Sequence, residues 1–121
     1  MIKIQNKNGE ISINEAVFTN ITGYAATNCF GVKGMAMLSM TDGLVHLLRK
    51  EAMGKGVHVT YNDDGSISIQ LHIIVEHGIN IAAVCRSIMS EVKYMVNKHT
   101  GIPVRSVDIC VDSVVSNSKG V

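Results

Sequence analysis

The residues best placed for chemistry are two histidines on neighbouring predicted strands. His58 faces Gln70 across a predicted hairpin, and His72 lies diagonally from His58 on the same polar face. Imidazole nitrogens are common zinc ligands, and Glu76, on the same side of the strand as His72, would be a third ligand. Zinc usually needs three or four protein ligands, so solvated histidines on an open sheet face are the favoured interpretation. We predict no metal and no cofactor.

The three cysteines, Cys29, Cys85 and Cys110, are the next candidates. None forms a CxxC pair, and no serine stands in a G-x-S-x-G turn. Cys85 lies on or near the apolar stripe of a predicted helix, and Cys29 opens an apolar segment, so both indicate core packing rather than nucleophilic catalysis. We therefore predict free thiols in a reducing compartment, and a protein that is not an enzyme.

A pair of glycines offers an alternative function. Gly31 and Gly34 flank Val32 and Lys33 in a GxxG motif, the pattern with which KH domains clamp a nucleic-acid backbone. In KH domains this loop joins two helices, whereas here it interrupts an apolar stretch, which favours a bend or a close strand contact. The alternative hypothesis is a KH-like RNA-binding protein that uses Gly31, Lys33 and Gly34.

Three closely spaced methionines, Met35, Met37 and Met40, follow this motif. Methionine is flexible and polarizable, so it fills irregular cores and also suits adaptable interfaces. Core packing is the simpler interpretation. If the run is exposed, it is the best candidate in the sequence for a partner-binding patch.

The first half of the chain has mixed periodicity. Alternating apolar residues predict a hairpin over residues 2–13, and a helix capped by Asn14 follows to about Thr27. A strand bent at its glycines is expected over residues 29–40. A short second helix, capped by Thr41 or Asp42, would then place its leucines on one face.

The pattern between Val57 and Val75 is the clearest in the sequence. A three-residue loop at 63–65 pairs Tyr61 with Ile67 and gives one apolar face, and it places Gly65 where a left-handed conformation is needed. His72 and Ile74 fall on the other face, which we predict to be part of a self-association surface. The alternative, given equal weight, is that the first helix or the 35–40 segment covers Ile74. The longest helix is expected over residues 81–99, and a last strand follows it.

Length and composition define the fold class. The chain has 121 residues, of which 46% are hydrophobic and 17% charged, with a net charge of +1, so it is neither disordered nor visibly adapted to nucleic acid. We predict a single α+β domain, with helices packed on one face of a mixed, mainly antiparallel sheet. The domain would span residues 1–113, and residues 114–121 would form a short flexible tail.

Several stretches, taken in order, carry a resemblance to a known family. They are residues 9–13 (GEISI), 29–35 (CFGVKGM), 42–44 (DGL), 56–59 (GVHV), 73–78 (IIVEHG), 100–104 (TGIPV) and 107–111 (VDICV). Their order and spacing resemble the alkaline shock protein family, the small envelope-stress proteins of Gram-positive bacteria. The resemblance covers residues 9 to 112, nearly the whole predicted domain.

This resemblance implies a cytoplasmic, non-enzymatic protein linked to cell-envelope homeostasis. Some members of the family are held at the membrane by a separate anchor protein and self-associate there. The leading hypothesis is therefore a protein–protein interaction or self-associating module, forming homo-oligomers or binding an envelope-linked protein near the membrane. Met35, Met37, Met40, His72 and Ile74 are the predicted interaction surface, and nucleic acid is not an expected partner.

Overall fold

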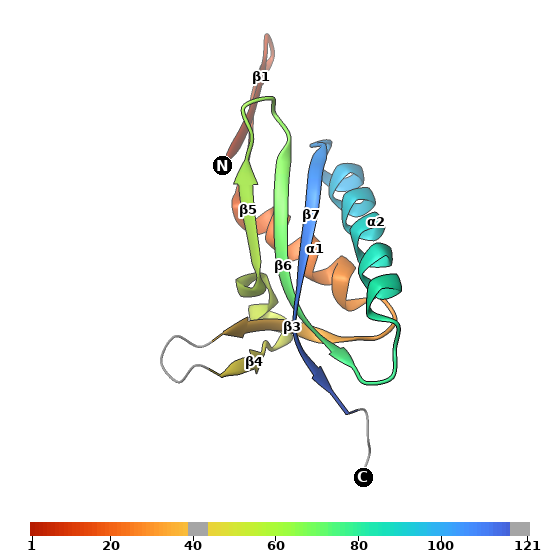
Figure 1. Cartoon of the computed structure of the whole chain (residues 1–121). Coiled ribbons are helices and arrows are strands. Elements are labelled where there is room, and N and C mark those ends of the chain that lie inside the picture. The colour runs from red at the N-terminus through yellow and green to blue at the C-terminus, as the bar shows by residue number, and fades with distance from the viewer. Residues whose placement is uncertain (39–43, 117–121) are drawn as a thin grey trace.

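The computed structural model describes residues 1–38 and 44–116, and its elements alternate between strands and helices (Figure 1). In chain order they are β1 (Ile2–Asn6), β2 (Gly9–Ile13), α1 (Glu15–Thr27), β3 (Val32–Leu38), β4 (Val45–Leu47), the 3-10 helix η1 (Lys50–Gly56), β5 (Val57–Tyr61), β6 (Ile67–Glu76), α2 (Ile81–Thr100) and β7 (Val104–Val115).

Strand β6 is the centre of the main sheet. One of its edges pairs antiparallel with β5 near its start and with β3 near its end, and its other edge pairs with the parallel strand β7. Strand β4 extends the sheet beyond β3. Side chains on one face of β6 are fully buried at Ile67, Ile69, Leu71 and Ile73, as the period-two pattern requires. The predicted α+β fold with a mixed, mainly antiparallel sheet is confirmed.

The β5–β6 hairpin has the predicted register. Tyr61 pairs with Ile67 and Val59 with Ile69. The loop is closed by the N–H of Asn62, which donates to the carbonyl of Ser66 at 2.9 Å. Gly65 has a φ of +88°, so it occupies the left-handed position that this loop demands.

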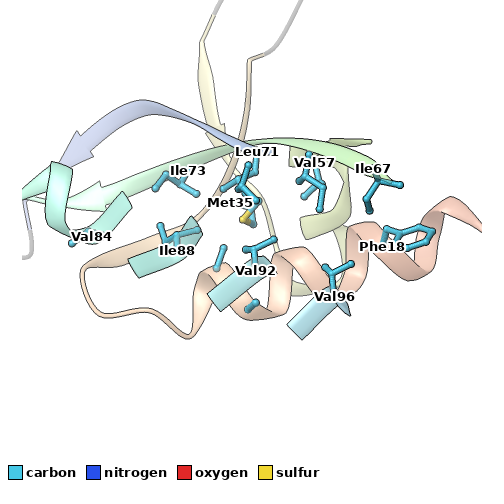
Figure 2. Close-up of a cluster of buried hydrophobic side chains, with 14 of the residues drawn as sticks. Phe18, Met35, Val57, Ile67, Leu71, Ile73, Val84, Ile88, Val92 and Val96 are labelled. Atoms are coloured by element: carbon cyan, nitrogen blue, oxygen red, sulfur yellow. The ribbon is translucent and has the colours of Figure 1, made fainter. Parts of the chain in front are cut away.

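Both α-helices contribute to one core beneath the sheet (Figure 2). The buried stripe of α2 is Val84, Ile88, Val92 and Val96, one residue per turn of the helix. Phe18 from α1 and Met35 from β3 complete the core, and Figure 2 shows these side chains between the strands and the helices. Helices therefore cover one face of the sheet, as predicted.

The predicted second helix is wrong over its first half. Residues 45–47 form β4, which pairs Leu47 with Ala36 and Val45 with Leu38, and the helical turns begin only at Lys50, in η1. The spacing of leucines 44, 47 and 48 fits a helix, but the chance to pair with β3 outweighs that local preference. The proposed caps Thr41 and Asp42 lie outside the described residues.

The N-terminal strands and the two α-helices each have a feature that bears on function. Strands β1 and β2 form a two-stranded sheet that is separate from the main one, with Ile4 opposite Ile11. Within residues 1–38 and 44–116, neither α1 nor α2 combines the length and apolar character needed to cross a lipid bilayer.

Candidate interaction surface

The outer face of the sheet brings together the histidines that the sequence placed there. The rings of His58 and His72 stand edge to face with centroids 5.9 Å apart. His72 Nδ1 lies 3.0 Å from Asp112 Oδ2 on β7, so the carboxylate orients this imidazole. In the part of the chain that the structure describes, no three His, Cys, Asp or Glu side chains gather closely enough to hold a metal ion.

The cysteines are placed as packing residues. The thiol of Cys29 donates to the carbonyl of Ala25 at 3.4 Å, and partial burial raises the pKa of Cys29. Burial likewise raises the pKa of Cys85. A nucleophilic cysteine requires the opposite shift, because the thiolate is the reactive form. These two thiols are therefore protonated at neutral pH and are not activated.

The GxxG motif lies at the start of β3 rather than between two helices. Gly31 has a φ of +90°, and its carbonyl accepts the N–H of Glu76 at 2.9 Å. A Cβ added to Gly34 would lie 2.7 Å from Leu47 Cδ1, so this glycine makes room for a neighbouring strand's side chain. Only Lys33 of the three predicted contacts is exposed. Both glycines have structural roles, and the geometry differs from a KH clamp.

The predicted interaction residues separate into buried and exposed ones. Met35 is 1% exposed and belongs to the core, and Ile74 is 4% exposed, so neither offers surface to a partner. Ile74 is opposite Gly34, and Leu47 Cδ1 lies close to that glycine. Ile74 is therefore buried within its own chain, but Leu47 belongs to β4 and not to the first helix or the 35–40 segment that the sequence suggested as its cover. His72 and Met37 remain accessible, and Met40 lies outside the described residues.

The sequence interpretation missed the apolar residues that are exposed beside Met37. Leu47 is 49% exposed, and Val45 and Leu44 are also exposed. We call Leu44, Val45 and Leu47 the arm patch. Pairing places Val45 and Leu47 on the outer face of the sheet and Met37 on the opposite face. Figure 1 shows β3 and β4 extending together beyond the helices. The alternation of Val45 and Leu47 is a sign of a strand in the sequence. The helical spacing of leucines 44, 47 and 48 favoured a helix instead.

The base of the arm borders a hollow of about 260 Å³ between α1 and β3. Its walls include Tyr24 from α1, Lys33 from β3 and Met53 from η1. Phe30, in the turn that leads into β3, is 85% exposed, a large fraction for an aromatic side chain. Phe30 and the arm patch are therefore both exposed to solvent.

Comparison with known proteins defines the class. Residues 3–116 match the alkaline shock protein 23 family, which has a cell envelope-related function. The chain belongs to this family, as its resemblance predicted.

The Bacillus subtilis (strain 168) protein YloU is 39% identical over 114 residues, which cover 93% of this chain and 94% of that protein. A protein from Streptococcus pyogenes serotype M6 is 34% identical over 114 residues, covering 93% of each chain. Among solved structures, MamM-CTD 215-293 superposes with a TM-score of 0.49 at 15% identity, covering 83% of this chain and 99% of that one.

Proposed function

We propose that this protein is a non-catalytic protein–protein interaction module of the cell envelope, which docks on an envelope-linked protein through the arm patch. The observation that carries this proposal is the exposure of Val45 and Leu47 on an edge strand. Apolar side chains grouped on an exposed surface lose water-contacting area when a partner covers them, and such groups mark interaction sites.

The rest of the molecule supports docking rather than catalysis. The pKa values of Cys29 and Cys85 are raised by burial, and His72, which pairs with the Asp112 carboxylate, lies on an open sheet face. The family's cell envelope-related function gives the setting, and cytoplasmic residence near a membrane-anchored partner belongs to the same proposal.

Site-specific photo-crosslinking tests the arm patch in the native cell. A photoreactive amino acid replaces Leu47 in one strain and Thr60, which is exposed on β5, in a matched control strain. We expect a discrete adduct with an envelope-linked protein from position 47 and none from position 60. The same adducts from both positions, or none from position 47, would refute docking through the arm. An adduct joining two copies of this chain would assign the arm to self-association instead.

A further inference from the structure

Strand β7 lies at one edge of the main sheet. In the part of the chain that the structure describes, β7 pairs with β6 alone, and β6 takes β5 and β3 on its opposite edge. Figure 1 shows β5, β6 and β7 side by side in this order. The outer edge of β7 is therefore without a neighbouring strand among the described residues.

The hydrogen bonds show which backbone groups face that free edge. The N–H of Ile67 donates to the Pro103 carbonyl at 3.0 Å, so the odd-numbered residues of β6 direct their backbone groups toward β7. In a parallel ladder, a residue paired with one of these directs its own N–H and C=O away from β6. Ile109 and Val111 are paired in this way, so their backbone groups point to the free edge. We call Ile109 and Val111 the edge pair.

The edge pair is accessible to another strand. Ile109 and Val111 are both partly exposed, whereas Val107, earlier on the same strand, is 4% exposed. Natural edge strands are often protected from further pairing by proline, lysine or a bulge. Residues 108–111 contain neither proline nor lysine, and the register of β7 shifts only after Val111.

A strand added at this edge would lie over an apolar floor. The side chains of the edge pair are on the inner face and only partly packed against the core. Helix α2 packs beneath β7, and Figure 2 shows its buried side chains below the strands. Ser87 and Glu91 of α2 act on the Cys29 thiol, which follows α1. Met89 is half a helical turn from both, so it points away from α1, and it is 37% exposed.

The outer side of the same edge is acidic. Asp108 is exposed on the outer face, and it has no ion-pair partner among the residues described. Asp112 lies further along β7 and is already paired with His72. Opposite charges on neighbouring strands stabilise a sheet, so Asp108 favours a strand that carries lysine or arginine at this position.

We propose that the free edge of β7 binds an extended segment of another protein, which adds a strand to the sheet. The segment places apolar side chains over Met89 and the edge pair, and lysine or arginine beside Asp108. Main-chain hydrogen bonds supply affinity in this mode of recognition, and the alternating side chains supply specificity. A second copy of β7 fits poorly, because it would bring Asp108 and Asp112 of two chains together.

This binding site goes beyond the docking proposed for the arm patch. Strand β4, which carries Val45 and Leu47, extends the sheet beyond β3, whereas β7 lies on the other side of β6. The two sites share no residue, so each can be tested while the other is left intact.

Amide hydrogen exchange tests the edge in the intact chain. We expect the N–H groups of Ile109 and Val111 to exchange rapidly and that of Cys110 slowly, because the same alternation directs the Cys110 N–H toward β6. Equal protection of all three would mean that the edge is already covered, which would overturn the proposal.

A short peptide that alternates valine with lysine is the probe for binding. Two further versions carry N-methyl groups, one on its valines and the other on its lysines. An added strand bonds through one of its own edges, so exactly one methylated version should lose binding, measured by fluorescence anisotropy. Equal behaviour of the two versions, no binding of the parent peptide, or competition by dimerisation of the chain itself would contradict strand addition by another protein.

Charge reversal at the edge tests the preferred sequence. We expect Asp108→Lys to weaken binding of the valine–lysine peptide by about two- to fivefold and to strengthen binding of a valine–glutamate peptide. Asp63→Lys makes the same change of net charge in the β5–β6 loop and should leave both affinities nearly unaltered. Identical effects of the two variants would mean that only net charge matters, and the assignment to β7 would fail.

The arm patch is tested by photo-crosslinking at position 47, which does not involve β7. An adduct at position 47 without peptide binding would refute only strand addition. Peptide binding without that adduct would refute only docking through the arm patch.

Discussion

At the scale of single residues, burial decides what each side chain can do. His72 and Ile74 are two residues apart on β6, so both side chains lie on its outer face. Ile74 is only 4% exposed, whereas His72 is partly exposed and pairs with Asp112. The two residues differ in their cross-strand neighbours, because Ile74 is paired with Gly34 of β3, beside which Leu47 lies close to the backbone.

The substitution Ile74→Lys tests this reading. A lysine here would carry an unpaired charge into an apolar site, so we expect the free energy of unfolding to fall by several kcal/mol, on the order of 3–5. Denaturant unfolding measures the loss. Thr60→Lys, at an exposed position of β5, serves as the control and should change stability little. Equal stability of the two variants would mean that Ile74 is not buried.

Asp64 shows how an exposed carboxylate can still be strongly constrained. Its Oδ1 accepts hydrogen bonds from the Ser66 hydroxyl at 2.6 Å and the Ser66 N–H at 3.0 Å, and its Oδ2 accepts one from Arg105 at 2.8 Å. The Ser66 hydroxyl and N–H, and then Arg105, hold the pKa of Asp64 well below its usual value of 3.8.

A pKa lowered by folding stabilises the native state above the unfolded value and loses that effect as the pH falls. We therefore expect Asp64→Asn to lower the melting temperature at neutral pH. The gap from the unaltered chain should close as the pH falls below 3.8. Thermal unfolding across this range measures the gap. The control Asp63→Asn removes the same charge from the neighbouring turn position, and its melting temperature should differ less from that of the unaltered chain. A difference for Asp64→Asn that does not change with pH would refute the assignment.

At the scale of elements, Asn14 connects the β1–β2 hairpin to α1. Its side chain accepts the N–H of Ala16, so Asn14→Ala leaves a donor of the first helical turn without its cap. We expect a loss of about 1 kcal/mol in unfolding free energy. Urea titration checks this value against Ser12→Ala, a change on the polar face of β2. Similar losses in both variants would show that the cap contributes nothing specific.

Elements with a strong local pattern were predictable from sequence. The register of β5 with β6 followed from alternation and Gly65, and the extent of α2 followed from its apolar stripe. β4 was not predictable in the same way. Its three residues carry too little pattern of their own, and their state depends on pairing with β3, which is a tertiary contact.

At the scale of the whole molecule, the candidate surfaces depended on which apolar residues remain uncovered. Composition and alternation cannot distinguish a buried isoleucine from an exposed one on the same strand face. Met35 and Ile74 are buried, whereas Met37 is exposed. Val45, Leu47 and the free edge of β7 emerge only when β4, β6 and β7 are set in space.

The central position of β6 also governs how quickly the chain can fold. Its two edges are completed by β3, which precedes it by more than one element, and by β7, which arrives only after the whole of α2. Each pairing closes a long loop before its hydrogen bonds offset the lost chain entropy. Folding of the sheet is therefore slower than that of a helical protein of similar size, and a chain that stops before β7 leaves one edge of β6 open to pairing with other chains.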